Sequence, residues 1–157
     1  MKKYNLDKVV KGVKEFIKVR GYEGIEIKLE DNKLTLDWFA DHFDNDGNTR
    51  FSYEFRAYTD SDRDYINIFF DFDNYDESEE LYKLLNEFNS IFPMNVKAYY
   101  VDNRWRFSWA EMYENYHNIS DLFATVFANF NDYTDDAEDN EYKDIFNALL
   151  ALRKKEE

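Results

Sequence analysis

The 157-residue sequence lacks cysteine and has only one proline and four glycines. Without cysteine, the chain cannot form a disulfide framework, a thiol nucleophile or a cysteine-based zinc site. The glycines are too scattered for a glycine-rich phosphate loop. No stretch approaches the roughly 20 apolar residues of a membrane span, and the N-terminus lacks the continuous apolar region of a signal peptide. We therefore expect a cytoplasmic protein that does not insert into membranes.

Catalytic motifs are also scarce. The only histidines are His42 and His117, and neither lies in a metal-ligand pattern such as HExxH. No GxSxG nucleophile elbow occurs. We expect the carboxylates in the polar stretch 59–64 to be solvated in a turn, which disfavours acid-base catalysis. We expect a protein without cofactor or metal that is not an enzyme, and a carboxylate- or metal-dependent enzyme is the weaker alternative.

Basic residues are few as well, with 20 Lys and Arg against 34 Asp and Glu, so the net charge is −14. Residues 1–20 carry +5, residues 41–80 carry −10 and residues 132–144 carry −6. This asymmetry argues against direct nucleic-acid binding and favours either a basic partner or a purely solubilising surface.

Aromatic residues, in contrast, make up 20% of the chain. A disordered acidic chain does not carry so many, and a mass of 19.1 kDa allows one domain with a sizeable core. Trp105, Phe107 and Trp109 alternate with polar residues, which is typical of the inner face of a strand. For Tyr99, Tyr113 and Tyr116 the sequence leaves core and interface open.

Hydrophobic periodicity predicts the elements. Apolar residues recur at helical spacing in 6–20, 81–92, 119–130 and 142–150, and Gly21 and Pro93 end the first two helices. Alternating segments predict strands around 25–30, 34–38, 51–56, 65–72, 96–100 and 105–109. Asp31-Asn32, Asn45 to Asn48 and Asp102-Asn103 are typical of hairpin turns.

The predicted order is helix, four strands, helix, two strands, two helices. Strands joined by hairpins indicate an α+β fold, with an antiparallel sheet of about six strands and helices packed on it. We expect residues 1–157 to form one domain, with an exposed acidic loop at 131–140 before a C-terminal helix.

The stretch DFDNYDESEE, residues 71–80, is best explained as a strand end followed by a helix start, with Asp76 as N-cap and Glu79 completing a capping box. As a calcium loop it has the wrong residues at key positions. Residues 42–53 match that loop better, but they begin with His42 and end with Tyr53, and Asp46-Gly47 is first a hairpin signal.

Acids two apart on an extended segment lie on one side, about 6.6 Å apart, and repel unless solvated or matched by cations. Such rows resemble a nucleic-acid backbone, which basic proteins bind. The candidate partner-binding residues are Asp44, Asp46, Asp60, Asp62, Asp64, Asp71, Asp73, Asp135, Asp136, Glu138 and Asp139.

The segments VVKGVKEFIKVRGYEGIEI and ELYKLLNEFNSIFPMNVKAYYVDNRWRFSW, with the element order from Leu6 to about Phe130, resemble the YbjN-like domain, which shares the fold of type III secretion chaperones. This resemblance implies a non-enzymatic protein that binds another protein, often as a homodimer. The acidic loop and helix after 131 depart from the family pattern.

The sequence thus predicts an acidic module that blocks a basic, nucleic-acid-binding protein. Phages and plasmids encode inhibitors of host defence nucleases, and some of these inhibitors have a similar composition: small, acidic, cysteine-free and aromatic-rich. An immunity protein against a basic toxin would act in the same way. The alternative is a chaperone-like adaptor that binds an apolar segment through the sheet and the aromatic residues.

Overall fold

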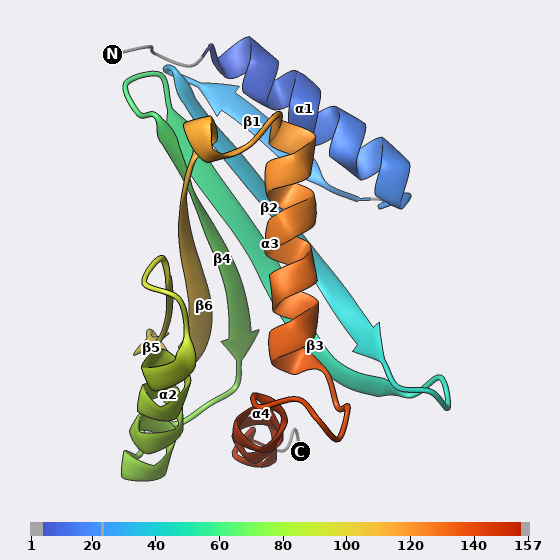
Figure 1. The fold of residues 1–157 in the computed structure, drawn as a ribbon, viewed down its shortest axis with the longest axis vertical. Helices are drawn as coiled ribbons and strands as arrows, with labels where there is room; N and C mark the ends of the chain where they lie inside the picture. The colour runs from blue at the N-terminus through green and yellow to red at the C-terminus, as the bar shows by residue number, and fades with distance from the viewer. Residues whose placement is uncertain (1–4, 23, 155–157) are drawn as a thin grey trace.

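A computed structural model describes residues 5–22 and 24–154 and confirms the α+β fold (Figure 1). The element order agrees with the predicted one, apart from a short 3-10 turn, η1. The elements are α1 Leu6–Arg20, β1 Glu26–Glu30, β2 Lys33–Phe43, β3 Thr49–Asp60, β4 Tyr65–Asp73, α2 Glu79–Ile91, β5 Val96–Val101, β6 Arg104–Met112, η1 Tyr113–Asn115, α3 Ile119–Thr134 and α4 Lys143–Ala151.

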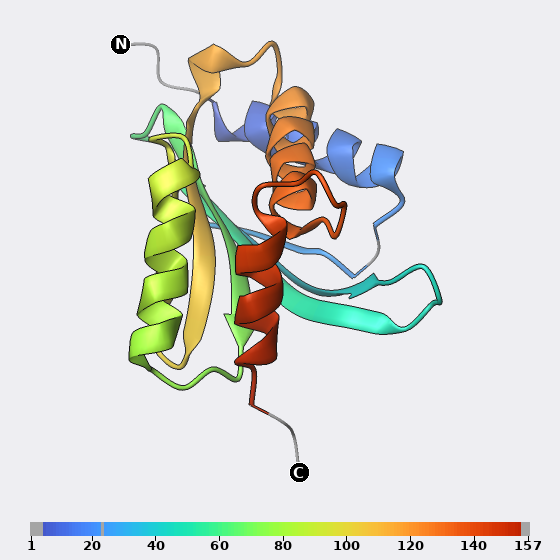
Figure 2. The ribbon, with the colours of Figure 1, turned by 60° about the horizontal axis from the view of Figure 1, so that its bottom comes forward.

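The six strands form one antiparallel sheet in the order β1-β2-β3-β4-β6-β5. Asp31-Asn32 and Asp102-Asn103 close their hairpins with positive φ at both residues, the conformation that matches strand twist in two-residue turns. The chain leaves the sheet after β4 and returns through α2 to β5 at the far edge. Strands β2 and β3 are the longest, and their hairpin projects beyond the neighbouring strands as an arm (Figure 2).

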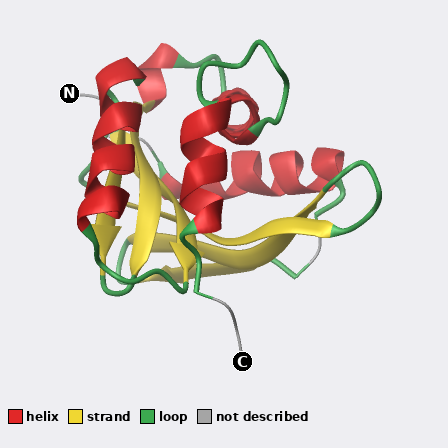
Figure 3. Cartoon of the chain, turned by 90° about the horizontal axis from the view of Figure 1, so that it is seen from below, coloured by secondary structure: helices red, strands yellow, loops and turns green. Residues whose placement is uncertain are grey.

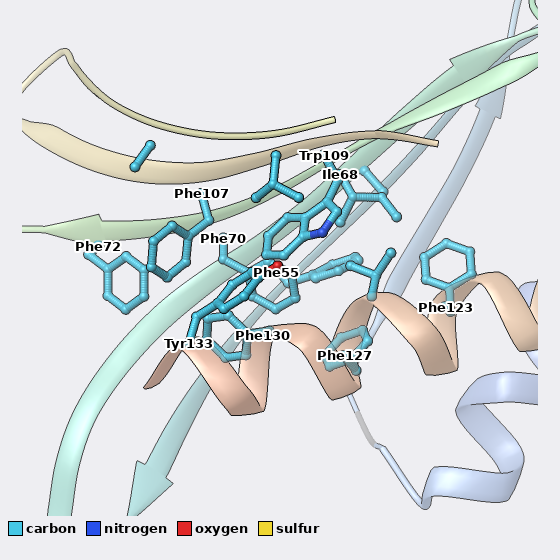
Figure 4. Packing of buried hydrophobic residues seen from close by; sticks show 14 of the residues in the cluster. Phe55, Ile68, Phe70, Phe72, Phe107, Trp109, Phe123, Phe127, Phe130 and Tyr133 are labelled. Carbon is cyan, nitrogen blue, oxygen red and sulfur yellow. The ribbon is translucent and has the colours of Figure 1, made fainter. Parts of the chain in front are cut away.

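All four helices cover one face of the sheet and leave the other face bare (Figure 3). Between helices and sheet lies an aromatic core, in which Phe127 of α3 contacts the rings of Phe16, Trp38, Phe55 and Phe70 (Figure 4). Each fully buried Phe contributes about 2 kcal/mol relative to an exposed one. The inner-face prediction for Trp105, Phe107 and Trp109 is confirmed, since all three are buried.

The start of α2 corrects the capping prediction. Ser78 is the N-cap, with its Oγ accepting a hydrogen bond from the Leu81 N–H at 3.1 Å. Asp76 lies two residues earlier and pairs with Lys154 instead, with 2.7 Å between Oδ1 and Nζ. The helix therefore begins two residues later than predicted, and the carboxylates of Glu79 and Glu80 occupy its first turn, where the helix dipole favours them.

The C-terminal helix docks on the domain. Phe146 and Leu149 of α4 are fully buried, and the Phe146 ring meets Phe51 and Phe72 edge-on. The exposed acidic loop is shorter than predicted, because α3 continues to Thr134 and buries Tyr133 and Thr134. Within the described residues, no helix has the length and apolar character needed to cross a membrane.

Candidate functional site

Two acidic segments that are far apart in the sequence meet at one end of the molecule. The tip of the β2–β3 arm and the α3–α4 loop line a shared hollow of about 300 Å³, with Asp44 on one side and Asp135 and Asp136 on the other. We call this region the acid end and define it by six exposed residues of the candidate set: Asp44, Asp46, Asp135, Asp136, Glu138 and Asp139.

Arg50 holds the acid end together. Its guanidinium donates to the Thr134 carbonyl oxygen and, at 2.8 Å, to Oδ1 of Asn147, and it lies 3.9 Å from Oδ1 of Asp136. It also lies over the Phe146 ring, 5.4 Å from the centroid. This side chain is 14% exposed, so its charge is directed into the protein and not toward a partner.

Local hydrogen bonds shape both segments of the acid end. Oδ1 of Asp44 accepts from the N–H groups of Asp46 and Asn48, each at 2.9 Å, and Oδ1 of Asp135 accepts from Ala137 N–H at 3.2 Å. Such Asp-led turns are a common structural use of the residue. Asp44 and Asp135 therefore have a structural role in shaping these two turns.

His42 lines the same hollow, and its surroundings favour the neutral imidazole. Partial burial lowers its pKa, the Arg50 charge lowers it further, and Asp135 opposes the shift. The ring stacks on Phe51 with centroids 4.7 Å apart. The lowered pKa of His42 reduces any positive charge that would offset the carboxylates around it.

The Asp60, Asp62 and Asp64 group lies at the other end of the long strands, in the β3–β4 turn (Figure 1). Asp60 accepts from the Asp62 N–H at 3.0 Å and pairs with Nε of Arg63 at 3.0 Å. These three acids are thus separate from the acid end, and at least Asp60 is matched by a cation.

Asp71 must be removed from the partner-binding candidates. It lies on the bare face but is only 1% exposed. Arg106 donates hydrogen bonds to both of its carboxylate oxygens, at 2.8 and 3.1 Å, and Arg104 donates a third, at 3.2 Å. Asp73, its neighbour on that face, is exposed and lies 3.6 Å from Nε of Arg104. The predicted acidic row is therefore an arginine-matched network.

The bare face as a whole is close to neutral. Strand register places on it eight acids (Glu26, Glu30, Asp37, Asp41, Glu54, Asp60, Asp71, Asp73) and six bases (Lys28, Lys33, Arg56, Lys97, Arg104, Arg106). The excess negative charge of the molecule lies elsewhere, on the loops and the outer sides of the helices.

The carboxyl group of Glu54 on this face interacts with that of Asp37. Burial raises the pKa of Glu54 to about 7, and a hydrogen bond with the Asp37 carboxyl and its negative charge add to the shift, against Arg56 and Arg104. Oδ1 of Asp37 is buried and lacks a hydrogen-bond donor when Glu54 is ionised. A protonated Glu54 supplies that donor.

Two exposed phenylalanines are a feature that the sequence did not single out. Phe39 and Phe43, on the bare side of the arm, are 75% and 58% exposed. Of the tyrosines left open above, Tyr113 is buried, Tyr116 is half-buried and donates to Glu111 at 2.7 Å, and Tyr99 is exposed beside Arg106. Period-two alternation could have flagged Phe39 and Phe43, because they are in phase with polar Thr35 and Asp37.

Within the described residues, no group of three or more carboxylate or imidazole side chains is arranged to hold a metal ion. Comparison with known proteins found no matching family model, no matching curated protein and no matching solved structure. The resemblance to the YbjN-like domain accordingly stays a prediction.

Proposed function

We propose that this protein is a non-enzymatic protein-binding module whose acid end occupies a basic, nucleic-acid-binding surface of a partner protein. An inhibitor of a defence nuclease and an immunity protein against a basic toxin are the two roles that fit. The observation that carries the proposal is that two exposed acidic segments meet around one hollow. The guanidinium of Arg50, which lines this hollow, is already bound by Asn147 and Asp136.

The physical mechanism is electrostatic steering followed by exclusion of nucleic acid. Carboxylates that converge from two loops raise the local negative potential more than either loop alone, which speeds the approach of a basic partner. Once docked, they occupy the positions of phosphates. The near-neutral bare face and the lysine-bearing α1, at the other end of the long axis (Figure 1), orient the molecule with its acid end toward the partner.

A matched pair of variants tests this proposal. Asp46→Asn with Glu138→Gln and Asp139→Asn removes three charges from the acid end and leaves the capping carboxylates of Asp44 and Asp135 in place. Asp60→Asn with Asp62→Asn and Asp64→Asn removes the same charge from the opposite end. The immobilised proteins are used to capture partners from a lysate of the source cells.

We expect the parent protein and the opposite-end variant to capture a nucleic-acid-binding protein that is released between about 0.05 and about 0.5 M salt, because exposed charges are screened beyond about 8 Å at physiological salt. Added duplex DNA should compete for that partner. The acid-end variant should not capture it. Equal capture by both variants, or capture that DNA leaves unchanged, would contradict the proposal.

The second candidate is a chaperone-like adaptor for an apolar segment. It is favoured by the bare sheet face and by the exposure of Phe39 and Phe43 on the arm. Binding of this kind buries apolar area and persists at high salt. Salt-resistant capture that Phe39→Ser with Phe43→Ser abolishes would identify it.

A further inference from the structure

One edge of the sheet is only half covered. β1 pairs with residues 33–37 of β2, and no described residue pairs with 38–43 on that side. We call residues 38–43 of β2, on the side where β1 stops, the free edge. It runs along the arm, beyond the end of β1 (Figures 1 and 2).

The backbone groups that point out from the free edge can be identified. Ser61 N–H donates to Asn32 O, and Asp44 N–H donates to Asn48 O, so even-numbered positions at both ends of β2 are bonded toward β3. In an antiparallel pair, successive residues of a strand bond alternately toward one neighbouring strand and toward the other side. The register shift near His42 places its extra residue in β3, so this alternation is not interrupted in β2. The N–H and C=O groups of Phe39, Asp41 and Phe43 therefore face outward.

Free edges are ordinarily protected by short length, lysine, proline or a covering segment. β1 is short and alternates Glu26, Lys28 and Glu30 on the bare face, and β5, at the other edge, carries Lys97. The free edge instead presents two exposed aromatic side chains, Phe39 and Phe43, with Asp41 between them. Its chemistry favours an added strand.

We propose that the free edge binds an extended segment of the basic partner as an additional strand that continues the line of β1. Strand addition supplies main-chain hydrogen bonds, and alternate side chains give specificity. The segment should place apolar side chains opposite Phe39 and Phe43 and a Lys or Arg opposite Asp41. Asp44 and Asp46, just beyond the free edge, extend the same preference for positive charge. This inference rests on the proposed function, because the occupant is part of that partner.

A second copy of this chain suits the free edge less well. Asp41 is the middle of the three outward-facing residues, so two-fold pairing along the whole free edge would place Asp41 against Asp41 of the other copy. Like charges directly opposite each other destabilise a strand pair. A cationic segment from another protein meets no such repulsion.

The test uses a fluorescent synthetic peptide, acetyl-TVTKTVT-amide, with two control peptides. In one control the lysine is replaced by glutamate, and in the other the amides that would pair with the free edge are N-methylated. Binding is followed by anisotropy, and hydrogen exchange of individual amides locates the peptide. We expect exchange at Phe39, Asp41 and Phe43 to slow by more than about tenfold with the lysine peptide alone.

Three variants distinguish the contribution of backbone hydrogen bonds to peptide binding from the contribution of charge. Asp41→Pro removes an outward N–H, spares the backbone hydrogen bonds to β3 and loses only the side-chain hydrogen bond from Ser52 Oγ. It should weaken peptide binding more than about tenfold. Asp41→Asn keeps the backbone N–H and should weaken peptide binding about 2- to 5-fold, as expected for the loss of one exposed charge pair. Leu29→Pro, at the matching outward position of β1, should leave binding unchanged.

Protection of β1 or β5 instead of the free edge, no protection up to millimolar peptide, or full binding by Asp41→Pro would each overturn the inference. Self-association that Asp41→Pro abolishes would do so too, because the occupant would then be a second copy. The same variants can be used in the partner-capture experiment. If the acid-end variant fails to capture the partner and Asp41→Pro still captures it, strand addition at the free edge is overturned and the proposed function stands. Retention in both variants overturns the proposed function as well.

Discussion

Asp71 is buried because two arginines replace the water that its carboxylate loses. Arg106 binds it through both oxygens, and the planar fork of the guanidinium suits that geometry. The same guanidinium lies over the Phe69 ring, 4.5 Å from the centroid, which fixes its orientation. Asp73, on the same face two residues further on, has one longer contact and remains in water.

This contrast predicts different costs for the same substitution. Asp71→Ala leaves two partly buried guanidinium groups without their shared anion, so we expect a loss of about 3 kcal/mol in the free energy of unfolding. Asp73→Ala removes one exposed pair and should cost at most about 0.5 kcal/mol. Urea unfolding of both variants measures the difference, and equal midpoints would show that the network contributes no more than a surface pair.

At the scale of elements, the helices α1 and α3 cross at Gly12. A Cβ at this position would lie 2.5 Å from Cβ of Ile119, closer than two carbon atoms can approach without movement of the backbone. Gly12 therefore sets the distance between the two helices, and with it the contact of Phe16 with Phe123 and Phe127.

Gly12→Ala should consequently destabilise the protein by about 1–3 kcal/mol, although alanine favours a helix over glycine. Ile119→Gly removes the opposing Cβ. In that background Gly12→Ala should become neutral or stabilise by up to about 1 kcal/mol, the difference in helix propensity. A double-mutant cycle by urea unfolding measures the coupling. Additive effects would place the cost of Gly12→Ala somewhere other than this crossing.

The elements themselves could largely be predicted, because their signals are local. Asp31-Asn32, Asp102-Asn103 and the helical stop at Gly21 act within a few residues, and each lies where the sequence indicated. The N-cap at Ser78 was missed because Asp76 is an equally good capping residue and the choice depends on how β4 joins α2.

The candidate site was less predictable because it depends on contacts between distant parts of the chain. That Asp71 faces two arginines of β6, and that Asp44 and Asp135 share a hollow, follow from strand order and helix packing. The acidic residues themselves were recognisable from composition. Which of them remain exposed was not, since arginine pairing leaves no local signal in the sequence.

For the whole molecule, three groups set how stability changes with pH near neutrality. Glu54, with its pKa raised to about 7, keeps a proton in the folded state that the unfolded chain releases at about 4.5. Burial also raises the pKa of Glu111, against hydrogen bonds from Tyr116 and Asn95. His42 acts in the opposite sense, because its lowered pKa means that the unfolded chain binds the proton more readily.

The sign follows from proton counting, since stability falls with rising pH wherever the folded state holds more protons. Glu54 should therefore lower stability as the pH rises from about 4.5 to about 7, Glu111 should act in the same direction, and His42 should raise stability up to about 6.5. Glu54→Gln isolates one contribution: its amide can still donate to Asp37 but cannot ionise. We expect this variant to gain stability relative to the parent as the pH rises through that window, and to keep a constant advantage above about pH 7.5. Urea midpoints measured across pH 4.5–8 test this, and a pH-independent difference would mean that folding does not raise the pKa of Glu54.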